Sequence, residues 1–181
     1  MLSEIYIIAS GIAAVIMWTV TAIKRNISYN KILLIVIFIL YMTALISATL
    51  FPIMYDKNLM TSKETPEVRI KLVPFEIIVF ELTNTSFYIA FVQIIGNVVM
   101  TVPFGILFPL IFQLKRKYLY MAFAILLPVS IESLQLVLDL SLGTYYRTVD
   151  VDDIILNFSG IMIGYLVCKL LPDKLKSKLT Q

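Results

Sequence analysis

The chain has 181 residues, of which 60% are hydrophobic, and a formal net charge of +3. Soluble domains contain roughly 45–50% apolar residues, so this composition, with a mean hydropathy of +0.91, indicates a membrane protein. The chain has no histidine and one cysteine, Cys168, which excludes an intrachain disulfide and Cys/His metal sites, and its basic residues form short clusters beside apolar runs, which argues against nucleic-acid binding.

Five apolar runs are long enough to cross a bilayer, which takes about 20 helical residues. Helices satisfy all their backbone hydrogen bonds within one segment, whereas a membrane barrel would need the alternation of apolar and polar residues that these runs lack. We therefore predict an all-α, polytopic helical bundle that forms a single membrane domain over residues 1–181. The expected spans are about residues 5–23, 32–53, 87–112, 118–138 and 154–171.

The lysines and arginines of the short connections indicate how the chain is oriented. Basic residues favour the cytoplasmic side of a membrane. Ten of them follow the first, third and fifth spans, whereas the connections on the other side are rich in acids. We expect the N-terminus outside and the C-terminus in the cytoplasm. The ten basic residues are Lys24, Arg25, Lys31, Lys115, Arg116, Lys117, Lys169, Lys174, Lys176 and Lys178.

The long connection of residues 54–86 contains the sequence "KLVPFEIIVFEL", which is apolar but too short to span. We expect a short helix after Pro74 that lies on the outer membrane surface, with Glu76 and Glu81 toward water. An ordinary amphipathic helix packed on the spans is the alternative.

Polar side chains within the third and fourth spans are informative, because a charge at the bilayer centre costs about 2.5–3.5 kcal/mol on insertion scales. Gln93 and Asn97 lie about 9 and 15 Å below the outer end of the third span. Glu132, Gln135 and Asp139 share one face of the fourth span, and that face cannot point at lipid.

The sequence "RTVDVDDIILNFSGIMIGY" places a polar stripe on one face of the fifth span and at its outer mouth. The spacing of 3, 4, 3 and 4 residues gives a single face, which grades from carboxylates through an amide to glycines. The two glycines form a G-x-x-x-G pair that predicts close helix packing. Asp152 falls off this face, so we expect it to be solvated or to cap the helix start. The stripe consists of Asp150, Asp153, Asn157, Gly160 and Gly164.

These spans can bring their polar groups together in a pocket that opens outward, with Arg147 as an anion contact. Clustered carboxylates could also hold a divalent cation such as Mg²⁺ or Ca²⁺, with Glu132, Asp150 and Asp153 as ligands; we expect no other cofactor. The alternative is that the polar groups bond one another and fix helix register. The candidate pocket residues are Gln93, Asn97, Glu132, Gln135, Arg147, Asp150, Asp153 and Asn157.

The sequences "GNVVMTVPFGILFP", "SIESLQ" and "RTVDVDDIILNFSGIMIGY" resemble three linked signatures of the VanZ-like membrane proteins. "KLVPFEI" resembles a stretch that precedes them in that family, with Lys71 where asparagine is common. The resemblance covers about residues 71–165, in the family's order. The matching positions are Asn97, Pro103, Gly105, Pro109, Glu132, Gln135, Arg147, Asp150, Asp153, Asn157, Gly160 and Gly164.

The resemblance implies a multi-pass protein of the bacterial plasma membrane whose family namesake is linked to resistance against the glycopeptide teicoplanin. It brings no settled reaction mechanism. Our leading hypothesis is that the outward pocket binds membrane lipid, a lipid-linked cell-wall precursor or the lipoglycopeptide itself. The alternatives are an intramembrane enzyme that uses Glu132, Asp150 and Asp153 on a lipid-linked or peptide substrate, and a non-catalytic interaction protein.

Overall fold

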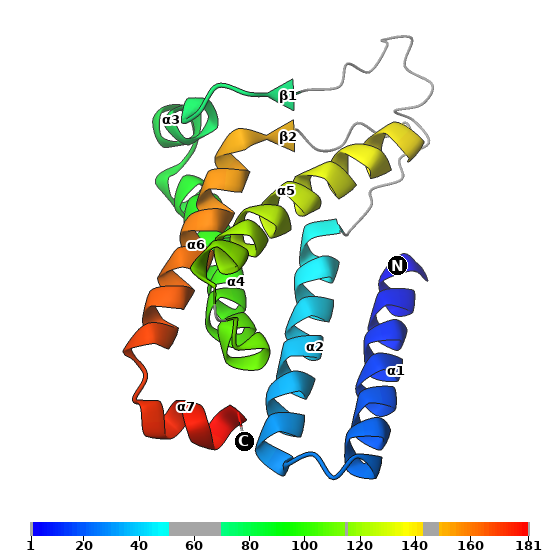
Figure 1. Ribbon diagram of the computed structural model, residues 1–181. Helices are drawn as coiled ribbons and strands as arrows, with labels where there is room; N and C mark the ends of the chain where they lie inside the picture. Colours follow the sequence, from blue (N-terminus) through cyan, green and yellow to red (C-terminus); the bar gives the residue numbers. More distant parts are fainter. Residues whose placement is uncertain (1, 51–69, 115, 143–148, 181) are drawn as a thin grey trace.

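The computed structural model describes residues 2–50, 70–114, 116–142 and 149–180. It contains five helices that are long and apolar enough to cross a membrane (Figure 1). The all-α, polytopic fold predicted from the sequence is confirmed. The five helices are α1 (Leu2–Lys24), α2 (Tyr29–Leu50), α4 (Phe87–Phe112), α5 (Lys117–Leu142) and α6 (Val151–Leu170).

Four shorter elements lie at the ends of these helices: α3 (Glu76–Asn84), α7 (Asp173–Thr180), β1 (Ile70–Lys71) and β2 (Val149–Asp150). A helix after Pro74 was predicted and is present as α3. The strands pair in parallel, with Ile70 opposite Val149 and Lys71 opposite Asp150. This pairing brings the chain before α3 beside the start of α6.

Four of the long helices extend beyond their predicted bounds, namely α1, α2, α5 and α6. α5 continues to Leu142 rather than ending near residue 138, so Asp139 lies inside the helix, where its side chain is 8% exposed. α6 begins at Val151, three residues earlier than expected, because its first turn is capped by a carboxylate. α2 begins at Tyr29, and residues 51–53 of the predicted second span lie outside the described residues.

The closest helix contact is between α4 and α6, and three glycines allow it. A Cβ added to Gly160 would lie 2.0 Å from the carbonyl oxygen of Val98, and one added to Gly164 would lie 2.1 Å from that of Val102. From the other side, a Cβ on Gly105 would lie 2.1 Å from the carbonyl oxygen of Ile161. Backbone thus meets backbone along this contact, as small residues permit in membrane helices.

Polar contacts and aromatic rings complete the packing around this pair. The Thr101 hydroxyl on α4 donates to the Asn157 carbonyl at 2.7 Å, and the Tyr120 hydroxyl on α5 donates to the Ile161 carbonyl at 3.3 Å. Phe104 and Phe108 stack with ring centroids 4.7 Å apart in the same core cluster. α6 is therefore held between α4 and α5.

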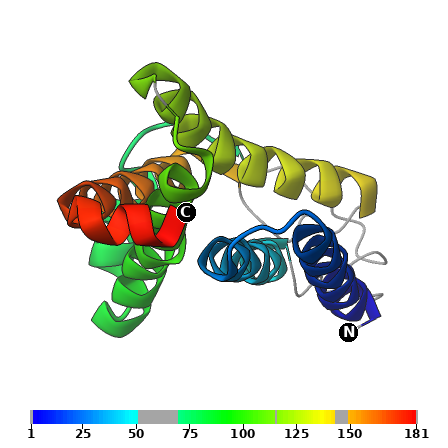
Figure 2. The same cartoon turned by 60° about the horizontal axis from the view of Figure 1, so that its bottom comes forward.

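α1 is the most peripheral span. It runs antiparallel to α2 at the edge of the bundle (Figures 1 and 2), where Gly11 lies against Thr43. Large apolar side chains such as Ile5, Met17 and Ile23 are 59–70% exposed in the isolated chain. Water would be an unfavourable neighbour for that much apolar surface, so these side chains are suited to contact lipid.

The two ends of the bundle differ in charge. The end with β1, β2 and α3 lies opposite the end with the α1–α2 turn and α7 (Figure 1). The first end carries carboxylates such as Glu76, Glu81 and Asp152. The second end is rich in lysine and arginine, namely Lys24, Arg25, Lys31, Lys174, Lys176 and Lys178.

Candidate functional site

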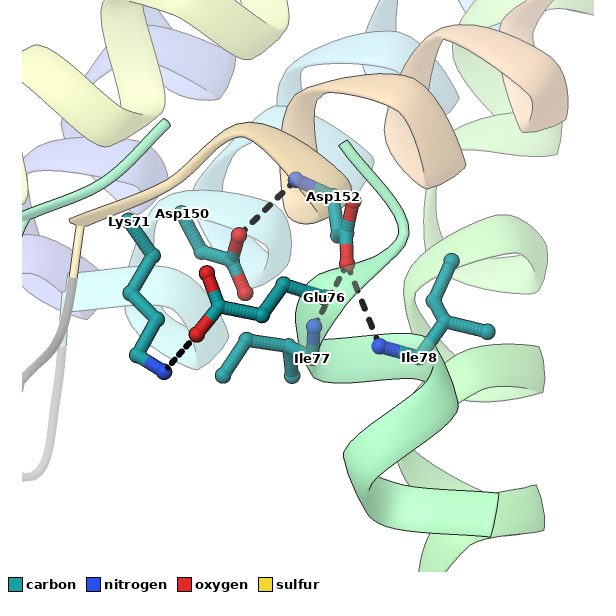
Figure 3. A network of polar contacts seen from close by, with 6 residues as sticks. All are labelled: Lys71, Glu76, Ile77, Ile78, Asp150 and Asp152. Carbon is teal, nitrogen blue, oxygen red and sulfur yellow. Dashed lines mark hydrogen bonds and ion pairs between the residues drawn. The ribbon is translucent and has the colours of Figure 1, made fainter. Parts of the chain in front are cut away.

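Asp152 is the central residue of the acidic end. Its side chain is 1% exposed, and its carboxylate accepts hydrogen bonds from three backbone N–H groups at the start of α3. The Phe75 N–H donates to one oxygen. The Ile77 and Ile78 N–H groups donate to the other at 3.0 and 3.1 Å (Figure 3). Asp152 therefore caps a helix that precedes it by more than 70 residues and fixes α3 to the start of α6.

The cap has to come from elsewhere because α3 lacks one of its own. Its N-cap position is Phe75, which has no side-chain acceptor and adopts φ 67°, in the left-handed region that non-glycine residues rarely occupy. The first N–H groups of a helix have no partner within it. A carboxylate at this place satisfies them and also interacts favourably with the helix dipole.

The expectation that Asp152 is solvated or caps its own helix was wrong. Asp150 caps α6 instead: its carboxylate accepts from the Asp152 N–H at 2.9 Å. The two aspartates thus cap two different helices: Asp150 caps α6 and Asp152 caps α3. A partly exposed salt bridge of 2.6 Å joins Lys71 of β1 to Glu76 of α3 beside these aspartates (Figure 3).

A cleft of about 240 Å³ opens between α3, α4 and the first turns of α6. In its wall Asn97 donates to Asp153 at 2.6 Å, which joins α4 to α6. In the amide orientation that suits its neighbours, Gln93 donates to both oxygens of Glu81 at 3.0 and 2.9 Å. The lining combines carboxylates, amides and aliphatic groups: Ile77, Ile78, Glu81, Gln93, Ile94, Asn97, Asp150, Asp152, Asp153 and Leu156.

Four of the predicted pocket residues line this cleft, namely Gln93, Asn97, Asp150 and Asp153. Three others lie elsewhere in the described part of the chain. The predicted single pocket is therefore divided: the side chains of Asp150 and Asp153 line the cleft, whereas Glu132 contacts the backbone N–H of Asp150 from α5. Arg147 lies outside the described residues.

The three residues outside the cleft have other contacts. Glu132 on α5 is 3% exposed and accepts from the Asp150 backbone N–H at 3.3 Å. Gln135 donates to the Thr49 carbonyl on α2 at 2.8 Å, so it contacts α2 rather than lining the cleft. Asn157 is buried, and its side-chain oxygen has no hydrogen-bond partner among the described residues.

The candidate cation site of Glu132, Asp150 and Asp153 does not form in residues 2–50, 70–114, 116–142 and 149–180. No group of three or more acidic or cysteine side chains there is arranged to hold a metal ion. The physical reason is that Asp153 turns to Asn97 on α4, whereas Glu132 approaches the backbone of Asp150 from α5.

Asp150 should make the stability of the protein depend on pH. Burial raises the pKa of its carboxyl above the usual 3.8; Asp152 and Glu76 act in the same direction, and the hydrogen bond from the Asp152 N–H and the charge of Lys71 oppose it. The folded state then binds more protons than the unfolded state, so the free energy of unfolding falls as pH rises from about 3.8 through the raised pKa.

We expect Asp150→Asn to flatten this fall, since the amide oxygen can still accept from the Asp152 N–H. Unfolding in mixed micelles at a series of pH values measures it. Asp173→Asn, which changes a fully exposed carboxylate at the other end of the bundle, is the matched control and should keep the slope. An unchanged slope in Asp150→Asn would show that another group is responsible.

The capping role of Asp152 was not predicted, although the sequence at the start of α3 contains one local indication of it. A helix that starts at "PFE" has no Ser, Thr, Asp or Asn at its N-cap, which leaves its first N–H groups to water or to an acceptor from another segment. The signal does not say which segment. The two-residue strands could not be predicted either, because they are too short to show an alternation of apolar and polar residues.

Comparison with known proteins identifies the family of this chain. Searches of curated proteins and of solved structures gave no match. A model of the VanZ/LLP1 family matches residues 38–172, more than half of the chain, and this segment includes α4, α5, α6 and the whole lining of the cleft. The match confirms the resemblance inferred from the sequence motifs, and the chain therefore belongs to the VanZ/LLP1 family.

Proposed function

We propose that this chain is a bacterial cell-envelope protein whose cleft faces outward and binds the polar part of an amphiphile at the outer leaflet. The ligand would be a lipid-linked cell-wall precursor or a lipoglycopeptide such as teicoplanin, in keeping with the link of the VanZ family to glycopeptide resistance. The observation that carries the proposal is the mixed lining of the cleft, in which carboxylates and amides stand beside aliphatic side chains.

The described lining favours a ligand rich in hydrogen-bond donors. Glu81, Asp150 and Asp153 present carboxylate oxygens, and the side chains of Ile94 and Leu156 present hydrocarbon. Ammonium, amide and hydroxyl groups donate to such oxygens, and hydrogen bonds to a charged acceptor are roughly twice as strong as neutral ones. This chemistry suits an amine-bearing or hydroxyl-rich head group with an apolar portion beside it.

The charge difference between the two ends supports the outward orientation. The cleft lies at the end opposite α7 and the α1–α2 turn, which carry the lysines. Under the positive-inside rule the lysine-rich end is cytoplasmic. The N-terminus and the cleft then lie outside, the C-terminus lies inside, and α3 rests at the outer membrane surface.

Binding at this place would protect the cell by competition. An antibiotic held in the cleft is not free to bind its precursor, and a precursor whose head group is held there is not free to bind the antibiotic. Either route acts by mass action, so the protection depends on the amount of protein in the membrane as well as on affinity.

Two cleft variants test the proposal. Asp153→Asn removes a charge from the lining, and Ile94→Trp fills the cleft. We expect each to lower teicoplanin tolerance of producing cells and to weaken teicoplanin binding to purified protein in nanodiscs. The expected loss for Asp153→Asn is about tenfold, the effect of one charge-assisted hydrogen bond, and Ile94→Trp should weaken binding by occupying the space of the ligand. Asp173→Asn, at the far end of the bundle, should behave as wild type. Undiminished tolerance in both variants at normal membrane levels would refute the proposal.

An enzyme acting on the same class of ligand is the second candidate, and one observation favours it. Asp150 lines the cleft, is 4% exposed and has a raised pKa, which are properties of a general acid or base. Incubation of the purified protein with lipid-linked precursor, followed by mass spectrometry, separates the two candidates. Turnover that Asp150→Asn abolishes supports the enzyme, and binding without turnover supports the binding protein.

A further inference from the structure

A second cavity, of about 310 Å³, lies at the lysine-rich end of the bundle, between α4, α6 and α7. Lys169 and Lys176 line it, and Asp153 of the outer cleft lies sixteen residues before Lys169 on the same helix, which corresponds to about 24 Å. The cavity is therefore separate from the cleft and takes no part in the function proposed above.

α7 is a fixed wall of this cavity rather than a trailing segment. The Asn30 side chain at the start of α2 donates to the Lys178 carbonyl at 2.9 Å, which ties the last turn of α7 to the bundle. Leu179 packs against the cluster of Leu34, Leu110 and Cys168. α7 thus crosses the ends of the spans, as Figure 2 shows from below.

The charge of the cavity is positive. The Lys176 ammonium donates to the Lys169 backbone carbonyl at 3.1 Å, and both lysines line the cavity. Its other partner, Asp173 at 3.4 Å, is fully exposed and does not line the cavity. None of the described lining residues is acidic, so the two ammonium groups are not neutralised from within.

The rest of the lining suits an amphiphile. Leu110, Tyr165 and Cys168 form an apolar wall, and Gln113 and Thr180 add uncharged hydrogen-bonding groups. Basic pockets between membrane helices at such a surface are suited to anionic lipid head groups, since the lysines meet phosphate while the wall meets glycerol and acyl carbons.

We propose that this cavity binds the phosphate head group of an anionic phospholipid. The phosphate lies between Lys169 and Lys176, with the upper part of the lipid against Leu110 and Tyr165. A lipid bound here also contacts α7, so it joins the last helix to the bundle at the membrane surface.

Native mass spectrometry of the full chain, released from micelles that contain both phosphatidylglycerol and phosphatidylcholine, tests the proposal. We expect wild-type protein to retain phosphatidylglycerol preferentially. The double variant Lys169→Gln with Lys176→Gln should bind it about tenfold more weakly, because both phosphate contacts lose their charge. The pair Lys169→Arg with Lys176→Arg should restore binding.

The matched control removes the same amount of charge at the same end of the bundle. Lys174→Gln with Lys178→Gln alters two exposed lysines of α7 outside the cavity, and its lipid binding should stay within about twofold of wild type. Equal losses in both glutamine pairs would reduce the effect to diffuse surface charge and overturn the site. Retention of phosphatidylcholine equal to that of phosphatidylglycerol would overturn it too. Displacement of phosphatidylglycerol by inorganic phosphate at the same concentration as the lipid would indicate a site for soluble anions and would also overturn it. Thermal unfolding of each variant without added lipid identifies any loss that comes from misfolding.

Discussion

Asp152→Ala is expected to lower the free energy of unfolding by about 2–4 kcal/mol and to release α3 from α6. The substitution leaves three backbone N–H groups at the start of α3 without the acceptor that now satisfies them. It also removes the negative charge that faces the positive end of the α3 dipole. Because Phe75 is held at φ 67° beside this carboxylate, the strained turn loses its support at the same time.

Hydrogen exchange gives this prediction a local readout. The amides of Phe75, Ile77 and Ile78 should lose protection in Asp152→Ala, whereas the amides in the middle of α4 should not. In Asp152→Asn the protection of these amides should lie between that of wild type and that of Asp152→Ala, because one side-chain oxygen remains as an acceptor while the amide nitrogen faces backbone donors. The control is Asp173→Asn, which changes a carboxylate in the first turn of an exposed helix. It should lower the free energy of unfolding by only about 0–1 kcal/mol. Unaltered protection of the three amides would show that α3 is held by other contacts.

Gly164→Ala is expected to cost about 3 kcal/mol by forcing α4 and α6 apart. The added Cβ would lie 2.1 Å from the Val102 carbonyl oxygen and 2.9 Å from the Gly105 Cα, and neither atom belongs to a side chain that could rotate away. Alanine gains about 0.5–1 kcal/mol over glycine in a helix, which is too little to offset the overlap. Gly160→Ala should behave alike, because its Cβ would meet the Val98 carbonyl oxygen at 2.0 Å.

Gly96 on α4 provides the matched control. A Cβ there meets nothing within 4 Å, so Gly96→Ala should leave the free energy of unfolding unchanged or raise it slightly. Unfolding in mixed micelles compares the three alanine variants directly. If Gly164→Ala were as stable as Gly96→Ala, the close approach of α4 and α6 described here would be incorrect.

The five long helices could be predicted from the sequence because each carries its own signal, an apolar run of membrane-spanning length. The stripe from Asp150 to Gly164 likewise contained enough information to place those residues on one face. In the structure that face meets α4, through Asp153 at its upper end and through the two glycines below.

The rest of the site could not be predicted because it depends on contacts between distant segments. Phe75 and Asp152 are 77 residues apart, and no local period links them. Depth along a helix follows from counting residues, but the direction in which a side chain points depends on how α5 crosses its neighbours. For this reason Glu132 and Gln135 were expected in the pocket and instead contact Asp150 and Thr49.

No helix was predicted at α7, whose lysines were used only to orient the chain. Its helical signals were present, since Pro172 and Asp173 begin it and Lys178 lies in its last turn. What the sequence could not supply was the contact that fixes it, the hydrogen bond from Asn30 near the other end of the chain.

The proposed function depends on a cleft that opens to the outside and binds a donor-rich amphiphile. The most direct test labels a single cysteine, Gln93→Cys in a Cys168→Ala background, with a membrane-impermeant maleimide in intact cells. We expect Gln93→Cys to be labelled from outside and teicoplanin to slow this labelling, while Lys174→Cys in the same background reacts only after permeabilisation. Labelling of Gln93→Cys only after permeabilisation, or labelling that teicoplanin does not slow, would contradict it.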